Sequence, residues 1–186
     1  MSSLHSVEGI GGKDLIMMKS KFAVTSVILT ALMMVSSGGA GTLVDPAALL
    51  TRADAEAVLG TPVKDPEVTT NPMGQKILHY SPVAQGTRVR YVQISVNQTA
   101  AMPNRMTRNG MSGPKLFEDS AKLLGTVQRL SGFGDKAFWG GSGLKAGAGL
   151  HVLKGDVYFS IDVALGNEQA DRQAAEGLAK QALSRM

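Results

Sequence analysis

The sequence predicts an α+β fold in which an antiparallel sheet of about five strands is packed by two or three helices. Residues 150–165 alternate apolar with polar or small side chains, and residues 168–185 place alanine and leucine at helical spacing. The predicted elements follow the order helix, two strands, helix, three strands, helix, or α-β-β-α-β-β-β-α. Short hairpin connections between the strands favour an antiparallel sheet with its helices on one face.

The hairpin over residues 150–165 is the centre of this prediction. Side chains on a strand point to opposite faces in turn, so its second strand has one apolar face. That face comprises Val157, Phe159, Ile161, Val163 and Leu165. Lys154-Gly155-Asp156 supplies the turn between the two strands. We expect the rest of the domain to cover the apolar face, and Asp156 and Asp162 to point to solvent.

The elements before the hairpin begin with a short helix. Thr51 suits its N-cap with Asp54 three residues on, and Gly60 ends it. Two strands follow at residues 76–81 and 87–97, the second partly covered on both faces. Residues 98–113 form a long polar connection without periodicity.

Pro114 suits the first turn of the next helix, which ends near Gly125. A turn over residues 131–135 seats Phe133 in the core, and residues 136–139 form a short strand. Residues 140–149 are a glycine-rich loop before the hairpin. The last helix, residues 168–185, has one stripe of small and apolar side chains: Ala170, Ala174, Leu178 and Ala182.

The first 41 residues predict a misannotated start followed by a secretory signal peptide. Lys19 and Lys21 precede an apolar run over residues 22–35, and small residues follow up to Gly41. The apolar run is shorter than the ~20 residues that cross a bilayer, so we expect cleavage rather than a permanent anchor. Residues 42–186 then form a single α+β domain, with at most peripheral membrane contact after cleavage.

Composition excludes several classes of function. The chain has no cysteine, which excludes disulfides, thiolate catalysis, zinc–cysteine sites and a lipid attached through cysteine. The net charge of +4 is spread along the chain and does not predict nucleic-acid binding. An exported chain without cysteine fits a periplasmic or secreted bacterial protein.

Two motifs flank the predicted sheet. Residues 49–60 read LLTRADAEAVLG just after the predicted signal, and residues 132–139 read GFGDKAFW before the strand hairpin. They resemble motifs of small bacterial cell-envelope domains of unknown function, some of which are lipoproteins and some similar to sensor regions of membrane kinases. This chain departs from the lipoproteins because it has no lipidation cysteine. The resemblance implies an α+β envelope domain and no activity.

No catalytic set or cofactor motif is complete. Residues 132–137 fit a dinucleotide pattern only formally, because Phe138 and Trp139 follow where a helix must begin. The loop after Trp139 lacks the Gly-Lys-Ser/Thr ending of a phosphate loop. His79 and His151 lie inside predicted strands, and we interpret them as structural. We therefore expect no cofactor and no catalytic residues.

Two groups of residues remain as candidate sites. Met102, Met106 and Met111 offer soft sulfur ligands that select Cu(I), or they pack as adaptable apolar side chains. Arg88, Arg90, Arg105 and Arg108 form an anion-binding rim, or a solvated surface.

The function expected from these observations is that of an exported, non-catalytic envelope domain. It binds a small ligand or an envelope partner protein, and it does not bind nucleic acid. The alternatives are a periplasmic hydrolase with an unrecognised site and Cu(I) handling through the methionine-containing loop.

Overall fold

The computed structural model describes residues 43–84 and 86–186. The predicted start and signal peptide, residues 1–41, lie outside the described residues. The helices are α1 (Pro46–Leu49), α2 (Arg52–Leu59), the 3-10 helix η1 (Thr99–Ala101), α3 (Asn104–Arg108), α4 (Gly113–Leu123) and α5 (Glu168–Ser184). The strands are β1 (Glu67–Thr70), β2 (Lys76–Tyr80), β3 (Tyr91–Gln98), β4 (Gln128–Leu130), β5 (Lys136–Trp139), β6 (Leu150–Lys154) and β7 (Val157–Ala164).

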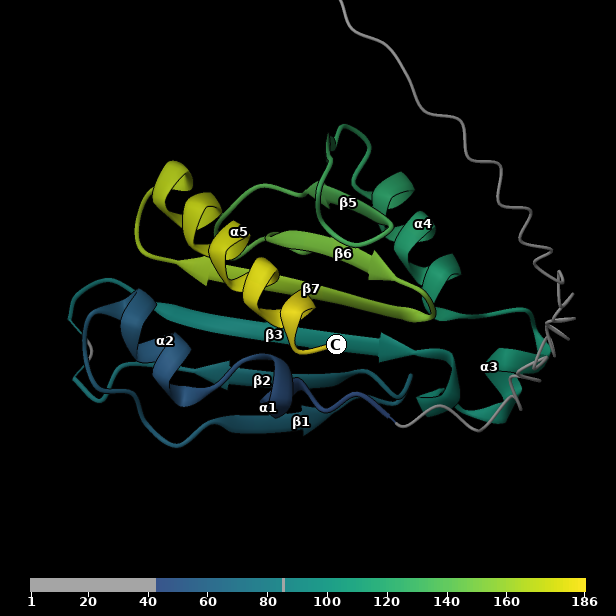
Figure 1. Ribbon diagram of the computed structural model, residues 1–186, viewed down its shortest axis with the longest axis horizontal. Helices are drawn as coiled ribbons and strands as arrows, with labels where there is room; N and C mark the ends of the chain where they lie inside the picture. Colours follow the sequence, from purple (N-terminus) through teal and green to yellow (C-terminus); the bar gives the residue numbers. More distant parts are fainter. Residues whose placement is uncertain (1–42, 85) are drawn as a thin grey trace, which may run out of the picture. The chain divides into compact units, whose positions relative to one another are not determined.

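The strands of the described chain form one antiparallel sheet in the order β1-β2-β3-β7-β6-β5-β4, which confirms the α+β class (Figure 1). The predictions of about five strands and of the order α-β-β-α-β-β-β-α were wrong in detail, because seven strands are present in the described part. The two unexpected strands, β1 and β4, are the sheet's edges. Every residue of β1 is exposed, and β4 has only 3 residues, so neither shows a burial pattern.

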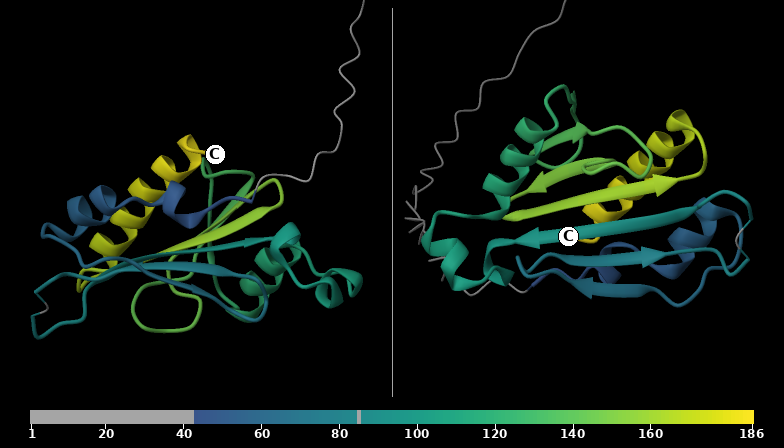
Figure 2. Two further views of the ribbon diagram at one scale, coloured as in Figure 1. Left: turned by 90° about the horizontal axis from the view of Figure 1, so that it is seen from below. Right: turned by 180° about the vertical axis from the view of Figure 1, so that it is seen from behind.

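One face of the sheet carries the main core. The predicted apolar face of β7 is confirmed, and Phe159, Ile161 and Val163 are fully buried on it. Neighbouring strands add Val92, Ile94 and Val96 from β3 and Leu150 and Val152 from β6. Helices α1, α2 and α5 cover this face (Figure 2, left). Burial of this face supplies most of the driving force for folding.

The other face is covered at one end by α4, so the prediction of helices on one face was wrong. Phe117 and Ala121 of α4 pack with Phe138, Leu153 and Tyr158 in a second, smaller core. The Phe117 and Tyr158 rings meet edge to face at 5.7 Å. Ser112 caps α4, with Pro114 in the first turn as expected. The second core fixes α4 beside β6 and β7 and leaves β2 and β3 outside it.

The sheet face that α1, α2 and α5 cover also holds both ends of the described chain. The Gln98 side chain donates to the Val44 carbonyl oxygen and accepts from its amide, both at 3.0 Å. Arg185 donates to the Leu49 carbonyl oxygen at 2.7 Å and to both carboxylate oxygens of Asp54. The Arg185 guanidinium is the largest influence that holds the pKa of Asp54 at about 2. The predicted capping box between Thr51 and Asp54 is present, so this carboxylate joins the start of α2 to the C-terminus.

Three features differ from the predictions: the start of one strand, the structure of one connection and the buried face of α5. The strand expected at residues 87–97 begins at Tyr91, and the connection expected to be irregular contains η1 and α3. The buried stripe of α5 comprises Asp171, Ala175, Leu178, Ala179 and Ala182, rotated from the predicted one. Asp171 is buried, and its carboxylate accepts the Leu165 amide hydrogen at 2.6 Å, which offsets the cost of burying it. No helix in residues 43–84 and 86–186 is long and apolar enough to cross a membrane.

Candidate functional site

A polar strip runs along the sheet face opposite the main core. Strand alternation places Gln93 and Ser95 of β3 there, and it does the same for Ser160 and Asp162 of β7. The register sets Gln93 opposite Asp162 and Ser95 opposite Ser160. The strip therefore lies across the two central strands, beyond the part that α4 covers.

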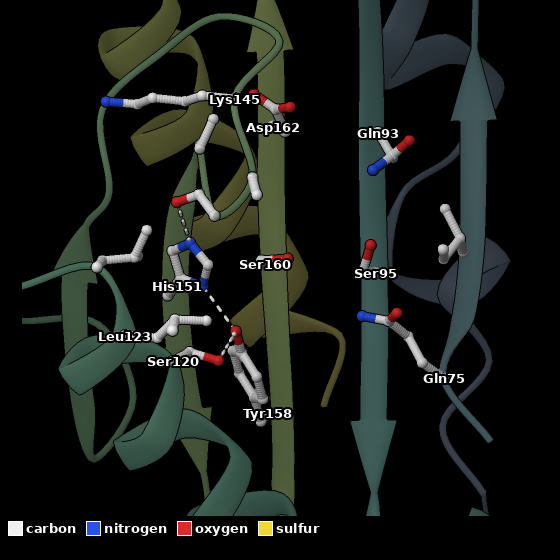
Figure 3. Close-up of a pocket in the computed structure, with 15 residues that line it drawn as sticks. Gln75, Gln93, Ser95, Ser120, Leu123, Lys145, His151, Tyr158, Ser160 and Asp162 are labelled. Atoms are coloured by element: carbon white, nitrogen blue, oxygen red, sulfur yellow. Dashed lines mark hydrogen bonds between the residues drawn. The ribbon is translucent and has the colours of Figure 1, made fainter. Parts of the chain in front are cut away.

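This strip is the floor of a cleft with a volume of ≈ 560 Å³. Leu123, at the end of α4, lies on one side of the cleft, and Gln75 lies on the opposite side (Figure 3). Leu124 and Ile77 also line it. Lys145 to Ala148, in the loop between β5 and β6, form the third side. The cleft thus combines apolar walls with amide, hydroxyl and carboxylate groups, as small-molecule sites do.

The glycine-rich loop, residues 140–149, reaches the cleft because its two ends are pinned. The Gly140 amide donates to the Gly149 carbonyl oxygen at 2.9 Å, and the Gly149 amide donates to the Gly141 carbonyl oxygen at 2.7 Å. Gly149 has φ +100°, and a methyl group there would collide with the Ile161 carbonyl oxygen. The loop lies on the sheet face away from α5 (Figure 2, left).

A chain of three hydrogen bonds connects this loop to α4 by way of one side chain from β6 and one from β7. His151 Nε2 lies 2.9 Å from the Gly147 carbonyl oxygen, so Nε2 carries the proton and donates. Nδ1 then accepts from the Tyr158 hydroxyl at 2.7 Å, and the Tyr158 oxygen accepts from the Ser120 hydroxyl at 3.2 Å. The imidazole also stacks on Phe138, with ring centroids 4.4 Å apart. Both ring nitrogens of His151 are engaged in these hydrogen bonds. His151 therefore links the loop to β7 and is not placed to act as a base for Ser120.

We expect His151 to stay neutral, with its proton on Nε2, to a pH below the usual pKa of histidine. Burial lowers the pKa of the imidazole, and the bonds to the loop carbonyls only partly oppose this effect. The unfolded chain binds this proton more readily, so the free energy of unfolding should fall as the pH drops below about 6.5. Long-range ¹⁵N–¹H NMR spectra measure the tautomer, and urea unfolding at several pH values measures the stability. His151→Gln should remove that share of the pH dependence, whereas protonation above pH 6.5 would contradict the expectation.

The prediction that the Asp162 side chain points to solvent was wrong. Its Oδ2 accepts from the Tyr91 hydroxyl at 2.6 Å, and its Oδ1 is buried. Within the described residues, Oδ1 is the one buried side-chain nitrogen or oxygen without a hydrogen-bond partner. Such a group costs about 1–3 kcal/mol of stability. Burial raises the pKa of Asp162, the Tyr91 hydrogen bond opposes this, and the Asp171 carboxylate raises it further. Asp156, in the β6–β7 turn, is exposed as expected.

The four arginines of the expected anion-binding rim lie in two separate places. Arg88 and Arg90 directly precede β3, and Arg105 and Arg108 lie in α3, beyond the other end of that strand (Figure 1). The Arg90 guanidinium donates to the Leu59 carbonyl oxygen at 2.8 Å, at the C-terminus of α2. The structure therefore does not bring the two pairs together into one rim.

The three methionines are close in the chain but differ in environment. Met102 is buried, while Met106 and Met111 are half-buried and joined by a backbone hydrogen bond of 3.0 Å. Within residues 43–84 and 86–186, no three histidine, aspartate or glutamate side chains are grouped to hold a metal ion. Cu(I) binding by methionine sulfur stays a prediction.

Sequence reasoning missed the polar floor of the cleft. Gln93 and Ser95 alternate with the apolar side chains of β3, and this alternation was the available signal. Only the pairing of β3 with β7, which are separated by more than 50 residues, shows that their polar faces form one surface. His151 is structural as interpreted, in the sense that its hydrogen bonds position the loop.

Comparisons with known proteins found no matching family model, no similar curated protein and no similar solved structure. The resemblance to envelope domains therefore stays a prediction from the two quoted motifs.

Proposed function

We propose that the protein is an exported, non-catalytic domain of the bacterial cell envelope that holds a small ligand in the cleft over β2, β3 and β7. The carrying observation is the cleft itself, ≈ 560 Å³ in volume and floored by polar side chains. Clefts of about 300–1,000 Å³ suit small molecules. Export and the envelope location rest on the leader predicted from the sequence.

The arrangement favours binding over catalysis. His151 would have to give up the Gly147 carbonyl or the Tyr158 hydroxyl before it could act as a base. Ser120 is separated from it by the Tyr158 hydroxyl. A hydrolase needs a nucleophile in direct reach of its base. The same three residues instead hold two sides of the cleft at a fixed separation, which favours a preformed binding site.

An experiment on co-purified material tests this proposal. The protein, expressed with its own leader in a bacterial host, should be recovered from the periplasm with a bound small molecule visible by native mass spectrometry. Ser160→Phe places a ring on the floor of the cleft and should remove this adduct. Thr70→Phe is the matched control, because it lies on the exposed strand β1 and alternates away from the cleft face, and it should retain the adduct.

Thermal melting of both variants establishes that the fold survives. The same adduct on the folded Ser160→Phe variant would contradict binding in the cleft. Recovery of the protein only in the cytosol, with its leader intact, would contradict export.

A further inference from the structure

The Asp162 carboxylate stands at the junction of two hollows. It lines the main cleft, and it also lines an adjoining hollow of ≈ 380 Å³ with His79, Tyr91 and Leu144. Tyr91 occupies Oδ2 at 2.6 Å, which fixes the carboxylate plane and leaves Oδ1 as the free acceptor. Oδ1 itself is enclosed, so a hydrogen-bond donor reaches it only where the side chains that line the two hollows give way.

No protein cation of the described chain fills this role. The ion pairs of residues 43–84 and 86–186 include neither Asp162 nor Lys145. Lys145 lines the cleft with its stem, but its ammonium extends away from Asp162 (Figure 3). That ammonium lies against Gly141, where an added methyl group would collide with it. Besides burial, the Asp171 carboxylate raises the pKa of Asp162, and His79, which lines the adjoining hollow, lowers it.

The apolar side chains that line the cleft suit an aliphatic group. Ile77, Leu123 and Leu124 line the cleft, and Leu123 is 87% exposed. Leu144, on the rim of the adjoining hollow, is 78% exposed. Large apolar side chains so exposed beside a polar floor are typical of surfaces that gain from covering by a ligand.

The tip of the loop, residues 142–146, can make room for a donor at Oδ1. The hydrogen bonds that hold the loop involve residues 140, 141 and 147–149, and within the tip only the Lys145 carbonyl oxygen accepts, from Ala148. Gly143 within the tip and Gly141 at its base both have positive φ. Side-chain packing therefore holds most of the tip, whereas hydrogen bonds hold the base of the loop.

From these observations we infer that the cleft takes a primary alkylamine, whose ammonium pairs with Asp162 Oδ1 while its aliphatic part lies along Leu123 and Leu124. This inference rests on the proposed function and names the ligand class of that same site. A charged donor is favoured over a hydroxyl because an ammonium adds Coulomb attraction to its hydrogen bond with the carboxylate, and partial burial strengthens that attraction.

Three probes of equal length test the class: hexylamine, hexanol and hexanoate. Binding is followed by ¹H–¹⁵N NMR titration at pH 8. At this pH the amine stays protonated, since the pKa of an alkylammonium group is ~10.4. Hexylamine should shift the amides of Ala146, Ser160 and Asp162 and bind about tenfold more tightly than hexanol, with hexanoate weakest. Raising the salt concentration should weaken hexylamine binding and leave hexanol unchanged.

Asp162→Asn should abolish the preference for hexylamine and leave hexanol binding within about twofold. Glu176→Gln is the matched control, because it removes the same charge from α5, on the sheet face opposite the cleft, and should change neither affinity. Equal binding of all three probes at the cleft amides would overturn the amine inference and leave the ligand cleft standing. Probes that shift no cleft amide, together with an adduct that survives Ser160→Phe, would overturn both.

Discussion

Replacing Phe159 with alanine is expected to lower the free energy of unfolding by about 3–5 kcal/mol. Phe159 is fully buried in the main core and is the third residue of β7. It is paired with Val96 on one side and Val152 on the other, so both neighbouring strands lose packing against its ring. Chemical denaturation in urea measures the loss.

The control for this substitution is Val68→Ala on the edge strand β1. Val68 is 58% exposed, so its truncation should change stability by less than about 0.5 kcal/mol. A loss below about 1 kcal/mol for Phe159→Ala would show that β7 is not the centre of the core.

Replacing Gly113 with alanine is expected to cost about 3 kcal/mol, although it adds a single methyl group. That methyl would overlap the Asp156 carbonyl oxygen in the β6–β7 turn, and neither backbone segment can yield without moving α4 or the hairpin. The Gly113 amide also donates to the Thr99 hydroxyl at 3.0 Å, which restricts the first turn of α4 further. Thermal and urea unfolding measure the effect.

The same substitution at Gly177 should have the opposite sign. Gly177 lies inside α5, and an added methyl group there meets nothing within 4 Å. Alanine should therefore stabilise the protein by about 0.5–1 kcal/mol through helix propensity. Equal effects at the two positions would contradict the close approach of α4 to the turn.

Local patterns in the sequence predicted the elements whose side chains carry the signal. The alternation in β7, the capping box of Thr51 and Asp54, and the turn that buries Phe133 were all confirmed. Each depends on residues within a few positions of one another, where spacing and backbone geometry decide the structure.

Long-range pairing decided the rest. Strand β1 exists because its backbone pairs with β2, although all its side chains are exposed. Asp162 looked like a solvated strand residue, but its carboxylate accepts from Tyr91 of the neighbouring strand and its Oδ1 is buried. The site likewise depends on the polar face of β3 lying beside that of β7, which no local spacing encodes. The four arginines of the expected anion-binding rim lie apart because the strand β3 runs between the two pairs.

The C-terminal residues, held by Arg185 against Leu49 and Asp54, lie on the sheet face opposite the cleft (Figure 2, left). A fluorophore, affinity tag or biosensor surface coupled at this end would therefore approach the molecule from behind and leave the cleft open to bulk solution. Immobilisation through Lys145 would instead block the entrance, so random amine coupling should yield a mixture of competent and obstructed molecules.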